Sequence, residues 1–211
     1  MPTAPRSLDK PSKIVCVGRN YAAHAKELGN EVPKEPLIFL KPPSSIIGDG
    51  DSILLPSQSR QVEFEGEIGI LLGDRLHHAT EAAAGRAVRA VLAANDVTAR
   101  DLQRSDSQWT RAKGFDTFCP IGEPGATLPS LDDLTLVSRV NGEERQRAHS
   151  TQMVFPIGAV LAYISTIMSL EPGDLVLTGT PAGVGALQDG DVVEVEIEGV
   201  SSVRNPVRTA P

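Results

Sequence analysis

The first half of the chain alternates short apolar runs with residues that favour turns, a pattern typical of short β-strands. Four such runs are predicted strands: residues 13–17, 37–40, 52–55 and 91–97. Residues 61–72 form the longest predicted strand, which becomes apolar on both faces from Ile68 onwards. A helix is predicted over residues 21–28, with Asn20 as its N-cap and Gly29 as its stop.

Two further helices are predicted later in the chain. Residues 79–90 are rich in alanine, and Glu81 lies where an acidic side chain favours a helix N-terminus. Residues 154–170 are the longest apolar stretch, and Pro156 suits a first helical turn. Turns are predicted at residues 141–142, 171–174 and 188–191, and further strands at residues 174–177 and 192–197.

These elements amount to roughly eight to ten short strands and three helices. The strands follow one another as in a meander, and they do not alternate regularly with helices as in βαβ units. The expected fold class is therefore α+β and rich in β-structure. Residues 13–211 are expected to form a single domain, and the polar, proline-rich residues 1–12 a flexible N-terminal segment.

Composition excludes several classes of protein. A chain of 211 residues buries roughly 70% of its surface on folding, so no disulfide or metal is needed merely to fold. With 40% hydrophobic and 22% charged residues, the chain is not of the disordered type. The net charge is −7 and no basic block stands out, so neither nucleic acid nor an anionic membrane is expected as a partner.

The cysteines and the apolar segments indicate a cytoplasmic protein. Cys16 and Cys119 are far apart and lack metal or redox spacing, which favours two buried thiols in a reducing compartment. Residues 1–13 lack the apolar core of a signal peptide. Residues 154–170 are interrupted by proline and hydroxyl residues and fall short of the ~18 apolar residues of a membrane span.

The strand predicted over residues 61–72 carries the first candidate chemistry. Glu63, Glu65 and Glu67 alternate along it, so in a continuous strand they would share one face about 6.5–7 Å apart. One interpretation is the solvated face of an edge strand. The other is a cation site, because a strand that becomes fully buried should not carry unpaired carboxylates. An all-oxygen ligand set favours Mg²⁺, Mn²⁺ or Ca²⁺.

Three other features are weaker by themselves. Asp96 ends an apolar run, where it is either a turn residue or a third carboxylate ligand. His24 and Glu27 share a face of the predicted helix, either as exposed residues or as a general base for water oriented by a carboxylate. Lys113 lies among small and apolar residues, and is either an anion-binding group or an ordinary surface lysine.

A glycine-rich segment at residues 177–185 completes the candidates. It lacks the Gly-Lys-Ser/Thr of a phosphate loop, and its spacing is not that of a dinucleotide fingerprint. Its glycines allow the backbone to approach a ligand or another strand closely.

Taken together, these motifs resemble the fumarylacetoacetate hydrolase superfamily. The resemblance is to its short, single-domain branch of acylpyruvase-like and 2-hydroxyhepta-2,4-diene-1,7-dioate isomerase-like proteins. It covers nearly everything from residue 13 to 207, and seven stretches carry it in family order: residues 18–21 with His24 and Glu27, then 39–42, 65–69, 95–103, 109–115, 140–143 and 172–185. The resemblance implies a mixed β-sandwich roll, usually as a homodimer.

The resemblance also implies roles for individual residues. Glu65, Glu67 and Asp96 would be the ligands of one divalent ion, usually Mg²⁺ or Mn²⁺, and Glu63 would not be a ligand. His24 and Glu27 match the pair that activates water. The positions that match substrate contacts are Gln103, Lys113 and Thr180 for substrate oxygens, and Arg19 for a substrate carboxylate.

The activity implied is hydrolysis of a C–C bond in a small keto acid. An acylpyruvate such as acetylpyruvate or fumarylpyruvate would chelate the metal and yield pyruvate and a carboxylic acid. Lys113 and Gln103 would stabilise the developing oxyanion, Lys113 thus counting among the catalytic residues. Three alternatives stay open: an oxaloacetate decarboxylase, a 2-hydroxyhepta-2,4-diene-1,7-dioate isomerase, and a catalytically silent metal-binding protein.

Overall fold

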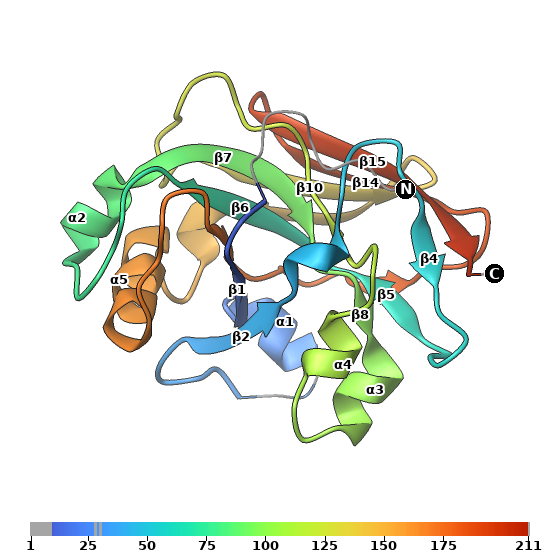
Figure 1. The fold of residues 1–211 in the computed structure, drawn as a ribbon. Coiled ribbons are helices and arrows are strands. Elements are labelled where there is room, and N and C mark those ends of the chain that lie inside the picture. The colour runs from blue at the N-terminus through green and yellow to red at the C-terminus, as the bar shows by residue number, and fades with distance from the viewer. Residues whose placement is uncertain (1–9, 28, 30, 211) are drawn as a thin grey trace.

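Two five-stranded sheets form the main layers of the computed structural model, which describes residues 10–27, 29 and 31–210 (Figure 1). The first sheet has the order β2-β1-β12-β6-β7, and its strands are β1 (Ile14–Gly18), β2 (Leu37–Lys41), β6 (Gly66–Leu72), β7 (Val88–Asn95) and β12 (Leu175–Leu177). The second has the order β11-β10-β14-β15-β4, and its strands are β4 (Ile53–Leu55), β10 (Thr135–Val140), β11 (Glu143–His149), β14 (Val192–Ile197) and β15 (Ser201–Thr209). Contacts of β7 with β14 and β15 hold the two sheets together.

Smaller elements surround these layers. The short strands are β3 (Ile46–Ile47), β5 (Val62–Phe64), β8 (Thr98–Ala99), β9 (Cys119–Pro120) and β13 (Gly185–Ala186). The helices are α1 (Ala22–Glu27), α2 (Glu81–Arg86), α3 (Arg100–Ser105), α4 (Thr110–Lys113) and α5 (Ile157–Ile167), with 3-10 turns at Pro43–Ser45 and Ser150–Gln152. Figure 1 shows α2 packed with α5 at the left of the molecule and α3 with α4 at its lower edge.

The strand pairing confirms a strand-rich α+β fold, but the first sheet is not a meander. Its strand β12 lies between β1, to which it is parallel, and β6, to which it is antiparallel. The predicted hairpin at Asn141-Gly142 is present between β10 and β11, and both residues have positive φ angles, 53° and 83°. Such angles are those of the tight turn that this dipeptide favours.

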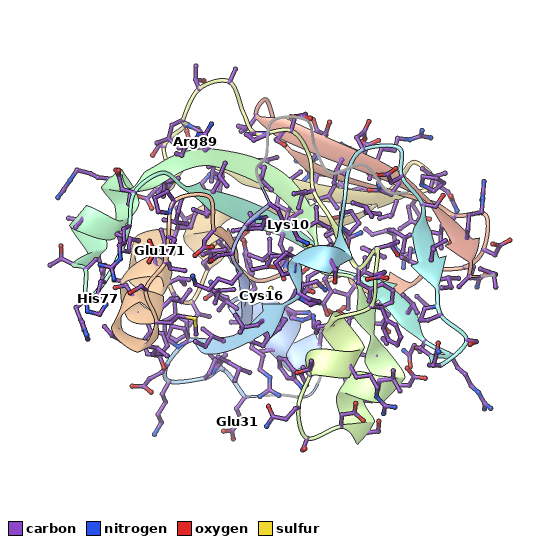
Figure 2. All side chains as sticks on the ribbon, in the orientation of Figure 1. Lys10, Cys16, Glu31, His77, Arg89 and Glu171 are labelled. Atoms are coloured by element: carbon purple, nitrogen blue, oxygen red, sulfur yellow. The ribbon has the colours of Figure 1, made fainter. Side chains whose placement is uncertain are left out.

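Both faces of the inner strands β1, β12 and β6 of the first sheet are buried, which explains their continuous apolar runs. Along β1, Val15 and Val17 point into the core between the sheets, which α5 extends. Ile14 and Cys16 point into a second cluster with Cys119 on β9. Both cysteines are free and buried, as expected, and burial raises the pKa of the Cys119 thiol to about 12. Figure 2 shows Cys16 in the interior, with Glu31 and His77 at the periphery.

Two predicted elements are wrong in their bounds. The helix expected over residues 79–90 covers only Glu81–Arg86, with Thr80 as its N-cap, because the β-branched residues that follow pair with β6 as strand β7. The strand expected over residues 61–72 is broken at Glu65 into β5 and β6.

Helix α1 also differs from its prediction. It begins at Ala22, and Asn20 does not serve as its cap but binds elsewhere: its side chain donates to Phe155 O and Thr178 O and accepts from Phe155 N. Residue 28 of the predicted helix lies outside the described residues, as do residues 1–9 of the segment predicted to be flexible.

Short helices α3 and α4 were not predicted, whereas α5 follows Pro156 as expected. In the described part of the chain, no helix has the length and apolar character that crossing a membrane requires.

Candidate active site

One cavity of about 390 Å³ gathers all the residues to which the resemblance assigns a role in metal binding, substrate binding or catalysis. They come from the turn after β1, α1, the start of β6, the end of β7, α3, α4 and the loop after β12. The predicted residues that line it are Arg19, His24, Glu27, Glu65, Glu67, Asp96, Gln103, Lys113 and Thr180. The volume suits a small organic ligand.

Neighbouring strands bring three carboxylates to the floor of this cavity. Glu65 immediately precedes β6, Glu67 is on it, and Asp96 follows β7, which pairs with β6 in register. One carboxylate oxygen from each of the three lies within 4.8 Å of the others. Their exposed fractions are 4%, 1% and 1%, so the three negative charges are almost wholly removed from water.

The break between β5 and β6 decides which glutamates belong to this group. Asn95 accepts a hydrogen bond from Glu65 N at 3.0 Å, and Asp96 N donates to Glu65 O at 2.8 Å. The ladder is therefore interrupted at Glu65, and Glu63 no longer follows the same face. Glu63 instead accepts from Arg100 Nε at 2.7 Å and is not among the three carboxylates that lie close to one another.

Three buried cations, Lys113, Arg100 and Lys41, pair with these carboxylates. Lys113 Nζ lies 2.8 Å from Glu65 Oε2 and 2.5 Å from Asp96 Oδ2, and Arg100 bridges Glu63 and Glu65. Burial alone would raise the pKa of Glu65, but Lys113 and Arg100 outweigh it and hold that pKa far below its usual range. Glu65 is therefore ionised.

Lys113 is held in its charged form by the same contacts. Burial would lower the pKa of its ammonium group, but Asp96 and Glu65 outweigh this effect and raise the pKa above its usual range. The ammonium also lies 4.9 Å from the centre of the Phe39 ring, a distance suited to a cation–π contact. Lys113 is thus a fixed positive charge and a hydrogen-bond donor, and it does not act as a base.

Glu67 shows that this group of carboxylates suits a cation. Glu67 Oε2 accepts a hydrogen bond from Gly179 N at 2.6 Å. Burial, and then the charges of Asp96 and Glu65, raise the pKa of Glu67 well above its usual range. A divalent ion would relieve this repulsion, and three carboxylates are the hard oxygen ligands that Mg²⁺ and Mn²⁺ prefer. Glu65, Glu67 and Asp96 are therefore suited to hold the ion.

His24 and Glu27 lie on the same face of α1 and line the cavity. His24 Nδ1 is 3.3 Å from Glu27 Oε2, and Glu27 also accepts from Gly183 N at 3.1 Å. His24 is buried, which rules out the interpretation of two exposed helix residues. Glu27 therefore fixes the imidazole and connects α1 to the glycine-rich loop.

The predicted substrate contacts lie around the same space. Gln103 Oε1 accepts from Arg100 at 2.5 Å, which leaves its amide N–H groups for an oxygen in the cavity. Thr180 is on the loop that follows β12, and Arg19 is in the left-handed region with φ 60°. This left-handed backbone conformation of Arg19 is costly for a non-glycine residue and is common at functional sites.

Several residues of the site were not assigned roles from the sequence. Lys41 Nζ donates to Asp96 Oδ1 at 2.7 Å and to Val97 O at 3.2 Å, although before two prolines it resembles an ordinary turn residue. Arg100 organises three side chains, and Arg104 also lines the cavity. The only signal for Arg100 was its position in the motif at residues 95–103.

Comparison with known proteins agrees with this site. The sequence profile described as "Fumarylacetoacetate (FAA) hydrolase C-terminal" matches residues 13–208. The chain is 44% identical to a protein of Arabidopsis thaliana named "Oxaloacetate tautomerase FAHD1, mitochondrial", over 94% of this chain and 92% of that protein.

Two solved structures from mycobacteria have the same fold. That of 5-carboxymethyl-2-hydroxymuconate delta-isomerase from Mycobacterium smegmatis is 44% identical with a TM-score of 0.89, covering 96% of this chain and 80% of that one. That of 2-hydroxyhepta-2,4-diene-1,7-dioate isomerase from Mycobacterium marinum is 45% identical with a TM-score of 0.87, covering 95% and 75%. The chain therefore belongs to the fumarylacetoacetate hydrolase family and is an enzyme of it.

Proposed function

We propose that the protein enolises a small 2-keto dicarboxylate of the oxaloacetate class, as a tautomerase or double-bond isomerase that depends on Mg²⁺ or Mn²⁺. The observation that carries this proposal is the buried group of Glu65, Glu67 and Asp96 directly beside the charged ammonium of Lys113. With a divalent ion held by these carboxylates, the ion and Lys113 together would concentrate positive charge where an enolate would form. The names of the relatives, which include tautomerases and isomerases, support the same class of reaction.

The bound ion would withdraw electron density from the keto and carboxylate oxygens of the substrate. Lys113 and the amide of Gln103 would donate hydrogen bonds to oxygens that gain negative charge. His24, held by Glu27, would take the proton from the carbon next to the keto group and return it to oxygen or to another carbon. Arg19 and Arg104, both on the cavity wall, would hold the second carboxylate.

A second candidate is hydrolysis of acylpyruvates, such as acetylpyruvate or fumarylpyruvate. The observation that favours it is again His24 with Glu27, because the same base could activate a water molecule for attack on the distal carbonyl. The C–C bond would then break to give a carboxylic acid and the enolate of pyruvate. Decarboxylation of oxaloacetate needs the same enolate stabilisation but no base.

The test is a panel of substrates with metal present and removed. Enol–keto conversion of oxaloacetate is followed by ultraviolet absorbance, and pyruvate and CO₂ release are measured with oxaloacetate, acetylpyruvate and fumarylpyruvate. We expect conversion of the oxaloacetate enol, its loss with EDTA and its return with Mg²⁺ or Mn²⁺. Glu65→Gln and Asp96→Asn should be inactive but folded. Metal binding without turnover of any substrate would instead indicate a catalytically silent metal-binding protein.

We also propose that the protein is a homodimer. Strand β2 is at the edge of the first sheet, and its Leu40 side chain is 48% exposed, which leaves an apolar edge for a partner to cover. Sedimentation should give twice the 22.4 kDa mass of the chain at micromolar concentration. A mass of one chain would contradict the proposal.

A further inference from the structure

Gln146 is a buried polar residue beneath the cavity, and its side chain makes three hydrogen bonds. It is on β11, opposite Ser138 of β10, and only 2% exposed. Its Oε1 accepts from Gly66 N at 3.0 Å, and its Nε2 donates to Thr180 Oγ1 and to Pro181 O, both at 2.8 Å. One amide thus connects the strand of carboxylates with the loop that carries Thr180.

The orientation of this amide is fixed by backbone groups. A backbone N–H can only donate, so the atom that faces Gly66 N is the oxygen. A backbone carbonyl can only accept, so the atom that faces Pro181 O is the nitrogen. It follows that Gln146 donates to the Thr180 hydroxyl.

This donation has a consequence for the cavity. Since Thr180 Oγ1 accepts from Gln146, the proton of the hydroxyl points away from Gln146. Thr180 lines the cavity and is almost fully buried. Its hydroxyl is therefore set as a donor, which suits a carboxylate or enolate oxygen of a ligand.

The oxygen of the Gln146 amide contacts the backbone between two of the carboxylates. Gly66 lies between Glu65 and Glu67, and a Cβ there would be 2.0 Å from Ser138 Oγ and 3.0 Å from Gln146 Oε1. The backbone between the two glutamates thus rests directly on β10 and β11. The same loop as Thr180 also supplies Gly179 N to Glu67 at 2.6 Å. The Gln146 side chain thus contacts both the backbone next to Glu67 and the hydroxyl of Thr180, and it helps to fix the spacing between these two residues.

We propose that Gln146 is a positioning residue, which orients the Thr180 hydroxyl as a hydrogen-bond donor to an anionic oxygen of the substrate. The inference rests on the proposed function, because it requires a keto-acid ligand in the cavity. Gln146 itself does not line the cavity and reaches it only through Thr180.

The test is a double-mutant cycle of Gln146→Met and Thr180→Val, with oxalate as a mimic of the pyruvate enolate. The dissociation constant of oxalate is measured by calorimetry at saturating Mg²⁺, beside Mn²⁺ affinity and thermal unfolding. Each single variant should weaken oxalate binding about tenfold. Gln146→Met should cause little further loss in the Thr180→Val protein, and Thr180→Ser should bind as the wild type does.

Ser138→Ala is the matched control, because it alters the buried residue opposite Gln146 and should leave oxalate binding unchanged. If Gln146→Met does not fold, Gln146→Glu replaces it in the cycle. An ionised glutamate at this position can only accept, so the Thr180 hydroxyl would donate to it and no longer to the ligand. The added negative charge acts on oxalate whether or not Thr180 is present, so the coupling energy between the two positions again reports the orientation of the hydroxyl. If the losses of oxalate affinity in the two single variants add up in the double variant, the inference is wrong, but the proposed function is unaffected. Failure of the wild-type protein to bind oxalate would overturn the proposed function and the inference with it.

Discussion

Lys41 Nζ lies 2.7 Å from Asp96 Oδ1, and the side chains of the two residues are 0% and 1% exposed. Lys41→Met should therefore leave a buried carboxylate with one cation fewer, at a cost of about 3–5 kcal/mol in the free energy of unfolding. Added Mg²⁺ should restore part of the loss, because an ion held by Asp96 replaces the missing charge. Urea unfolding with and without Mg²⁺ measures both effects. Lys34→Met, at an exposed lysine, is the control, and equal stability of both variants would contradict the prediction.

His24 and Lys113 should differ in which reactions they support. His24→Ala removes a general base and should slow enolisation and acylpyruvate cleavage by about 10²–10⁴. It should largely spare oxaloacetate decarboxylation, which needs no base. Lys113→Met should impair all three reactions, because each develops enolate charge beside this ammonium group.

The three reactions are measured on both variants, with metal content and fold checked. A proportional loss of all three activities in His24→Ala would be inconsistent with its role as a base.

Gly183 should tolerate no side chain. It has φ +102°, and a Cβ there would lie 2.1 Å from Arg145 O, a backbone atom of β11 that cannot turn aside. Gly190, with φ +91° and no atom within 4 Å, separates backbone strain from this clash. Gly190→Ala should cost about 1–2 kcal/mol in stability. Gly183→Ala should cost more in urea unfolding, and it should also lower activity because Gly183 N no longer reaches Glu27.

Stability should fall in acid partly through Asp174. Its carboxylate is buried, which would raise its pKa, but donors from Glu171 N, Lys13 and Ser12 outweigh burial and lower the pKa. A lowered pKa in the folded state gives stability that is complete above the unfolded pKa of about 3.9 and is lost as the pH falls through the folded value.

Asp174→Asn should therefore be less stable than the wild type at pH 7, with a difference that shrinks below about pH 4. Urea unfolding at both pH values measures this change. Asp132→Asn, at an exposed carboxylate, should show no such dependence. An unchanged difference between Asp174→Asn and the wild type from pH 7 to pH 3 would refute the prediction.

Local chemistry explains what could be predicted from the sequence. The hairpin at Asn141-Gly142 was predictable because few other residue pairs adopt two positive φ angles readily. A cation site beside Glu65 and Glu67 was predictable because a buried strand is not expected to carry unpaired carboxylates at its end. In both cases the reason lies within a few residues, whereas the addition of Asp96 and the exclusion of Glu63 rested on the resemblance to the family.

Long-range contacts explain what could not be predicted. The break at Glu65 depends on the side chain of Asn95, thirty residues later in the chain. The contacts of Lys41 and Gln146 appear only once distant strands meet. Lys41 lies in the stretch 39–42 that contributes to the resemblance, but nothing in that stretch assigns it a contact, and Gln146 lies in none of the stretches. Helices α3 and α4 have six and four residues, too few for an apolar periodicity to be recognised.

The insertion of β12 between β1 and β6 determines when the enzyme becomes complete. All three predicted metal ligands precede residue 100, yet the strand that joins their sheet, and the loop with Gly179 and Thr180, come after residue 174. Such a high contact order delays folding, because a long loop must close first. During synthesis, which proceeds from the N-terminus, the nascent chain therefore holds an unfinished sheet until its last third has emerged. A protein truncated before β12 should contain every candidate ligand and yet have no active site.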